Sequence, residues 1–167
     1  MNRKKLTAIR IILIILTVAV MVTIFLLSAD NADESNAKSE LFSDSLVYRI
    51  LATFDLTDEQ IEEVINISVL IVRKTAHFAE YAVLGFLLAS ICVSFYLKPK
   101  LTVPVSFLAG ALYAVSDEIH QYFVPGRSCQ LSDMLLDSSG VICGIVFLLI
   151  ITALYNFIQK KKNLRAS

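Results

Sequence analysis

The chain has 167 residues, of which 56% are apolar and 18% charged, and its formal net charge is zero. Apolar residues are more frequent and charged residues scarcer than in soluble globular domains. This composition excludes an ordinary soluble domain and indicates a protein whose solvent is lipid. The three cysteines have no metal-like spacing, so neither a zinc-type cysteine site nor a disulfide framework is expected.

The first apolar run covers residues 11–29 and follows four basic residues: Arg3, Lys4, Lys5 and Arg10. The run nearly spans a hydrocarbon core of about 30 Å. It is also longer than the apolar part of a cleaved signal peptide, typically about 7–15 residues. Residues 1–29 are therefore predicted to form a retained transmembrane helix, although Leu27-Ser28-Ala29 could also serve as a cleavage site.

A polar, acidic segment, residues 30–72, separates this helix from the next apolar run. Its first part has no apolar periodicity and is predicted to be a loop. Two amphipathic helices are predicted after it, on the membrane surface or over the bundle. Thr57 and Gln60 form a capping-box pattern that would begin the second, through residue 68. The sequence leaves open whether this helix continues into the membrane. The apolar positions of the first amphipathic helix are Leu41, Phe42, Leu46, Ile50 and Phe54.

Three further apolar runs, residues 76–97, 101–122 and 134–158, are each long enough to cross a bilayer. Unpaired backbone groups are costly in lipid, so the runs should be helical, and short connectors make neighbours antiparallel. We predict an all-α integral membrane protein with four transmembrane helices in a hairpin-pair bundle. Residues 73–158 form its three-helix core and residues 159–167 a basic tail. Small residues four apart predict packing faces at Gly140/Gly144, Gly110/Ala114 and Gly85/Ala89.

Basic residues predict the orientation in the cell membrane. With the amino terminus in the cytoplasm, the short cytoplasmic segments hold ten of the fifteen lysines and arginines. Every aspartate and glutamate then falls in an outer loop or the outer part of a helix. We therefore expect a multi-pass protein with both termini cytoplasmic. The basic residues serve orientation, and no nucleic-acid partner is expected.

Three polar patches lie at helix ends on the predicted outer side, where unpaired charges would be costly. Entering the second membrane helix, Arg73, His77 and Glu80 share one face. Asp133 and Asp137 lie one turn apart on the last helix. The topology brings these patches together with the end of the third helix. The residues expected to form a ligand-binding site are Arg73, Lys74, His77, Glu80, Tyr81, Glu118, Gln121, Arg127, Asp133 and Asp137.

The chemistry of this cluster is less determined than its position. Glu80 and Glu118 could act as acid or base, with Asp133 positioning a substrate, but no serine or threonine has the spacing of a nucleophile. No His-Glu-x-x-His or paired cysteine motif is present, so no metal and no cofactor are expected. Asp117 is expected to be solvated and His120 to face lipid headgroups. A purely structural role, in which the charges pair to hold the bundle together, also fits.

At these positions the chain resembles the VanZ-like family. The resemblance implies a bacterial multi-pass membrane protein, and the founding member of the family is linked to reduced susceptibility to teicoplanin, a lipid-tailed glycopeptide. It rests on three ordered motifs: Arg73-Lys-x-x-His77-Phe-x-Glu80-Tyr81, Asp117-Glu118-x-x-Gln121-x-Phe-x-Pro-Gly-Arg127 and Asp133-x-x-x-Asp137-x-x-Gly140.

Three functional hypotheses follow. The first is a non-enzymatic membrane protein whose outer-leaflet polar pocket engages membrane lipid, a cell-wall precursor or another cell-envelope component, or a lipoglycopeptide, with a role in teicoplanin-type antibiotic resistance. The second is a membrane-embedded hydrolase or transferase acting on a lipid-linked headgroup. The third is a structural partner of another membrane protein, through the first helix or the acidic segment. The sequence does not indicate an oligomeric state.

Overall fold

The computed structural model describes residues 3–30, 37 and 57–166, and its elements in this part of the chain are helices. They are α1 (Arg3–Ser28), α3 (Asp58–Ser94), α4 (Pro99–Tyr122) and α5 (Leu131–Ala166). The predicted all-α class is thus confirmed for the described residues. The predicted amphipathic helix within residues 41–54 lies outside them.

The predicted capping box begins α3. The Thr57 side chain accepts a hydrogen bond from the backbone N–H of Gln60, and the Gln60 side chain accepts one from the backbone N–H of Thr57. From there α3 runs without interruption for 37 residues, to Ser94. The second amphipathic stretch and the second membrane helix are therefore one helix.

Three of the described helices are long and apolar enough to cross a membrane: α1, α3 and α5. The 37 residues of α3 extend about 55 Å, more than a hydrocarbon core of about 30 Å. Large apolar side chains on the outside of these helices are exposed, as lipid-facing residues would be; Ile15, for example, is 61% exposed. The shorter α4 is not among the three, so the predicted fourth crossing stays a prediction.

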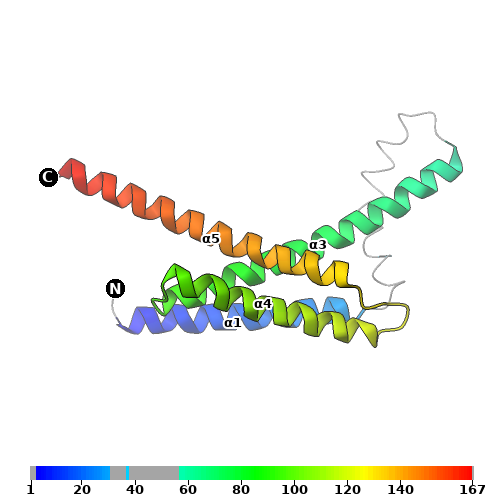
Figure 1. Ribbon diagram of the computed structural model, residues 1–167, viewed down its shortest axis with the longest axis horizontal. Helices are drawn as coiled ribbons and strands as arrows, with labels where there is room; N and C mark the ends of the chain where they lie inside the picture. Colours follow the sequence, from blue (N-terminus) through cyan, green and yellow to red (C-terminus); the bar gives the residue numbers. More distant parts are fainter. Residues whose placement is uncertain (1–2, 31–36, 38–56, 167) are drawn as a thin grey trace.

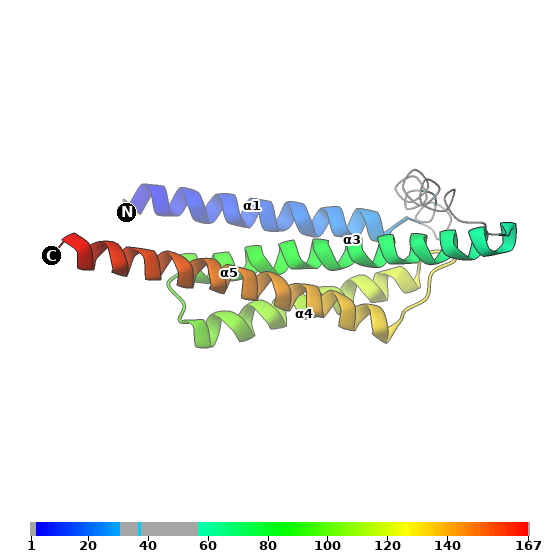
Figure 2. The same cartoon turned by 90° about the horizontal axis from the view of Figure 1, so that it is seen from above.

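Figures 1 and 2 show how the helices are arranged. α1 and α4 run in one direction and α3 and α5 in the opposite one. Both termini point toward the end at which α3 connects to α4, and the α4–α5 loop lies at the other end, near the end of α1. The first turns of α3 and the last turns of α5 project beyond the other helices (Figure 1).

The most extensive contact between helices is that of α3 with α5. It is made at the small residues that the sequence predicts to mark packing faces. A Cβ atom on Gly140 would lie 2.5 Å from the carbonyl oxygen of Phe78, and one on Gly144 would overlap the carbonyl oxygen of Ala82. Gly85 of α3 faces the backbone of Val141 in the same way. Only glycine permits this approach of the two backbones.

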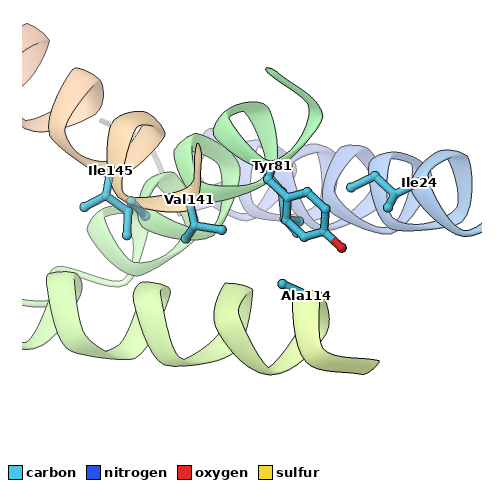
Figure 3. Close-up of a cluster of buried hydrophobic side chains, with 7 residues drawn as sticks. Ile24, Tyr81, Ala114, Val141 and Ile145 are labelled. Atoms are coloured by element: carbon cyan, nitrogen blue, oxygen red, sulfur yellow. The ribbon is translucent and has the colours of Figure 1, made fainter. Parts of the chain in front are cut away.

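All four helices contribute to one apolar core. Ile24 of α1, Tyr81 of α3, Ala114 of α4 and Val141 of α5 are each completely buried, and Figure 3 shows them converging. α1 is thus packed against α3 and, less extensively, against α4.

Polar contacts hold α1 at both ends of this core. The Tyr113 hydroxyl of α4 donates a hydrogen bond of 2.6 Å to the carbonyl oxygen of Met21. Toward the other end, the Arg10 guanidinium donates to the carbonyl oxygen of Ser94 and lies 4.1 Å from the centre of the Phe95 ring. Because these contacts satisfy carbonyl groups in an apolar setting, they fix the position of α1 along the bundle.

The substitution Gly144→Ala should lower the free energy of unfolding by about 1–3 kcal/mol, because the added methyl forces α3 and α5 apart. At an unconstrained helical position the same change would stabilise the helix by roughly 0.5–1 kcal/mol. Equilibrium unfolding in detergent micelles by increasing SDS measures the difference. Cys143→Ala, at the exposed neighbouring position, is the control. A Gly144→Ala protein as stable as the wild type would contradict the packing described.

Candidate functional site

A polar cavity of about 160 Å³ lies where α3 and α5 meet the end of α4 and the α4–α5 loop. Eight of the ten predicted site residues line it. The described lining residues are Arg73, Lys74, His77, Glu118, Gln121, Gly126, Arg127, Ser128, Gln130, Asp133, Leu136 and Asp137.

The other two predicted site residues do not line the described cavity. Glu80 is half-buried on α3, one turn beyond His77. Tyr81 is completely buried in the apolar core, where its ring lies 6.2 Å from that of Tyr113. Helical spacing grouped both residues with the cluster but could not show that Tyr81 is covered by a neighbouring helix.

Lys74 and Asp133 connect α3 to the beginning of α5. The ammonium Nζ atom donates to Oδ1 of Asp133 at 2.6 Å, and both side chains are partly exposed. A partly exposed pair of this kind contributes little to stability. Its position nevertheless places one positive and one negative charge on the cavity wall.

The prediction that Asp117 is solvated was wrong: its side chain is 3% exposed. Its Oδ2 atom accepts hydrogen bonds from the Ser28 hydroxyl at 2.8 Å and from the Gln121 amide at 3.1 Å. These donors come from α1 and from the next turn of α4. A buried carboxylate needs such donors because it has lost its hydration. The network makes the end of α1 part of the site.

Gln121 continues this network to the loop. Its side-chain oxygen accepts a hydrogen bond of 3.0 Å from Nη1 of Arg127. The loop itself turns at Pro125-Gly126, where Gly126 has a φ of 77° that favours glycine. The turn and the Gln121 contact together place the Arg127 side chain at the cavity.

The remaining edge of the Arg127 guanidinium has no partner. Its Nε and Nη2 atoms are buried, and neither forms a hydrogen bond with any described residue. Burial, and then the charge of Arg73, lower the pKa of Arg127 from its ordinary value. Arginine is not deprotonated in folded proteins, so the guanidinium keeps its charge. The cavity wall thus contains a charged, two-donor fork that has no hydrogen-bond partner among the described residues.

Glu118 holds the other side of the loop. Its Oε1 atom accepts a hydrogen bond of 2.7 Å from the backbone N–H of Gln130, just before α5 begins. Its Oε2 atom is buried and has no hydrogen-bond partner among the described residues. The Oε1 atom therefore holds the loop in place, and the Oε2 atom remains available for a hydrogen bond or proton transfer in the cavity region.

His120, which the sequence predicts to face lipid headgroups, is half-buried and stacks on Phe25 of α1 with ring centroids 4.3 Å apart. It therefore contributes to packing between α1 and α4 and does not line the described cavity.

Sequence reasoning missed three contributors: Ser28, Asp117 and Gln130. Ser28 looked like part of a cleavage site, and no spacing rule connects it to a residue 89 positions away. The sequence pattern could have identified Asp117 as a site residue, since it lies one helical turn before Gln121 and beside Glu118. Gln130 acts through its backbone, which leaves no signature in the side-chain pattern.

The sequence model of the VanZ/LLP1 family matches residues 13–152, most of the chain. The protein belongs to the VanZ/LLP1 family. The matched range includes residues 13–28 of α1 in addition to the three motifs. Neither the curated proteins nor the solved structures contain a match to this VanZ/LLP1 chain.

Gln121→Leu keeps the side-chain volume but removes the hydrogen bonds to Asp117 and Arg127. We expect the free energy of unfolding to fall by about 1–3 kcal/mol, because two buried charged groups lose a partner. The control is Gln130→Leu, whose side chain is exposed and whose backbone bond to Glu118 survives. Its stability should change by no more than about 0.5 kcal/mol. Unfolding in SDS measures both variants. If Gln121→Leu and Gln130→Leu changed the free energy of unfolding equally, the hydrogen bonds of Gln121 would not be what stabilises this end of the bundle.

Proposed function

We propose that this VanZ/LLP1 protein uses its polar cavity to bind an anionic group of a cell-envelope component or lipoglycopeptide at the outer leaflet. In this proposal α4 is the fourth crossing helix, both termini are cytoplasmic, and the cavity opens at headgroup depth. The distribution of basic residues along the chain supports this orientation.

The observation that carries the proposal is the unpartnered Nε–Nη2 edge of Arg127. This edge presents two parallel N–H donors, the geometry that matches a carboxylate or a phosphate group in a bidentate pair. A buried guanidinium whose donors lack partners is costly, so an incoming anion that supplies acceptors would gain from it. Arg73 and Lys74, consecutive residues of α3, line the same cavity; Arg73 adds positive charge, and Lys74 is paired with Asp133.

The carboxylates of the cluster hold these basic groups in place. Asp133 binds Lys74, and Gln121, itself bound to Asp117, holds Arg127. A site whose donors are already positioned loses less freedom on binding than one assembled around its ligand. The cavity is small, about 160 Å³, which suits a headgroup rather than a whole lipid or glycopeptide. The rest of an amphipathic ligand would lie in the bilayer beside the apolar helix surfaces.

Direct binding tests this proposal. The purified chain in nanodiscs should bind a diphosphate-linked lipid precursor of the cell wall, or teicoplanin, and Arg127→Ala should weaken binding by at least about tenfold, the value of a charged hydrogen bond. Arg127→Lys should recover only part of the affinity, because lysine lacks the fork. Lys98→Ala, an exposed basic residue at the opposite end, is the control. Affinity for both ligands that is unaffected by Arg127→Ala would refute the proposal.

Susceptibility of a sensitive Gram-positive host tests the resistance role. Expression of the wild-type chain should raise the inhibitory concentration of teicoplanin more than that of vancomycin, and Arg127→Ala should remove this protection at equal membrane levels. The reason is that protection would require the cavity to engage its ligand. Protection that survives Arg127→Ala would place any resistance function outside the cavity.

One observation favours a membrane-embedded enzyme as a second candidate. The Oε2 atom of Glu118 is buried and unpartnered among the described residues, and Glu118 lines the cavity, as an acid or base must. Asp133 is less suited to proton transfer because it pairs with Lys74. A hydrolase or transferase would form a product from a lipid-linked headgroup in the wild type, and none in Glu118→Gln that still binds the substrate. The binding hypothesis predicts no turnover in either protein.

A further inference from the structure

We infer that His77, Asp117 and Asp137 form a binding site for a divalent transition-metal ion, with Zn²⁺ as its best-matched probe. The three residues come from α3, α4 and α5. One ligand atom from each, an imidazole nitrogen and two carboxylate oxygens, all lie within 4.8 Å of one another. The proposed ligands do not include Arg127, which lines the same cavity, and the inference does not depend on the proposed function.

The two carboxylates supply the independent reason for a cation. Asp117 is 3% and Asp137 2% exposed, and the Oδ1 atom of each is buried without a hydrogen-bond partner among the described residues. Neither forms an ion pair with a described basic side chain. Two carboxylates so close together cannot both be charged in an apolar setting unless a cation or a shared proton compensates them.

The geometry is close to that of a metal site. Ligands about 2.0–2.2 Å from an ion lie roughly 3–4 Å from one another. The 4.8 Å limit of the cluster exceeds this by roughly 1–2 Å, which rotation of the side chains about their torsions can supply. Asp117 is already oriented, because Ser28 and Gln121 both donate to its Oδ2 atom and leave Oδ1 free. Hydrogen bonds of this kind orient the ligands of established metal sites.

The donor set determines the class of ion. One imidazole and two carboxylates, with no thiolate, suit Zn²⁺ or Mn²⁺ better than a soft ion, while the imidazole disfavours Mg²⁺ and Ca²⁺. Three protein ligands leave at least one coordination position open. Because His77 and Asp137 line the cavity, that position faces it, so water or an oxygen of a bound headgroup could occupy it.

Nearby positive charges oppose a cation, so the charge balance matters. The cavity wall carries three basic residues, Arg73, Lys74 and Arg127, and three carboxylates. Asp117, behind the wall, is a fourth carboxylate, and half-buried Glu80 on α3 is a fifth. Lys74 is neutralised by Asp133. The carboxylates therefore outnumber the basic groups, and a divalent ion would reduce the imbalance.

The experiment uses the full chain, purified through a histidine-free affinity tag, in nanodiscs. After dialysis against ZnCl₂ and removal of loose metal, we expect one zinc per chain, and isothermal titration should show affinity at least about tenfold weaker in His77→Gln and in Asp137→Asn. The controls are His120→Gln, the other histidine of the chain, and Glu62→Gln, an exposed carboxylate on α3. Zinc that binds in less than equimolar amount, or equally well in His77→Gln and Asp137→Asn, would overturn the inference.

Two further measurements cover the remaining outcomes. If the variants do not fold, zinc K-edge absorption of the wild type decides: one imidazole with oxygen ligands supports the site, and sulfur from the exposed Cys129 overturns it. Arg127→Ala should bind zinc at least as tightly as the wild type, because a nearby positive charge is removed, while anion binding falls. Loss of zinc binding in Arg127→Ala would contradict the inference that zinc and the anion are bound by different residues. Zinc binding by a wild-type chain that binds no anion would refute only the proposed function.

Discussion

The close approach of α3 and α5 is the contact on which the position of the polar site depends. Gly140 lies against the carbonyl oxygen of Phe78, which is the residue after His77, and Asp137 comes one turn before Gly140. The same backbone contact that fills the apolar core therefore sets the separation of His77 and Asp137. Van der Waals packing between small residues is the main force available for this in lipid, where burial of apolar surface gives no advantage between helices.

Charge compensation is the second constraint, because Asp117, Glu118 and Asp137 are buried. Asp117 has donors from two helices, Glu118 accepts from the loop backbone, and Lys74 pairs with Asp133. These contacts compensate part of the charge of the polar cluster. The atoms left without a partner among the described residues are concentrated at the cavity, on Arg127, Glu118, Asp117 and Asp137. Buried groups that a fold leaves unsatisfied are expensive to maintain, and they are common where a ligand completes the set.

The buried groups at the cavity without hydrogen-bond partners among the described residues are of two kinds. The proposed function concerns the Arg127 guanidinium, and the metal inference concerns the carboxylates of Asp117 and Asp137. A guanidinium edge calls for an anion with two acceptor oxygens, whereas paired carboxylates beside an imidazole call for a cation. Both lie at one end of a bundle whose outer surface is apolar. A phosphate-containing headgroup could meet both requirements, since its oxygens accept hydrogen bonds and also coordinate metal ions. Membership of the VanZ/LLP1 family agrees with a membrane location but does not by itself assign a ligand.

The sequence by itself determined the features that depend on local pattern. Apolar length predicted the helices, Thr57 and Gln60 predicted the start of α3, and small residues four apart predicted the packing faces that α3 and α5 use. Helical spacing and the predicted topology together gathered eight of the cavity residues, because side chains three, four and seven apart share a face and the helix ends meet on one side. Only the tertiary structure decided the burial of Asp117, the contribution of Ser28 from α1 and the convergence of His77, Asp117 and Asp137. Each of these depends on the packing of different helices, and contacts between residues far apart in the chain leave no periodicity within any one segment.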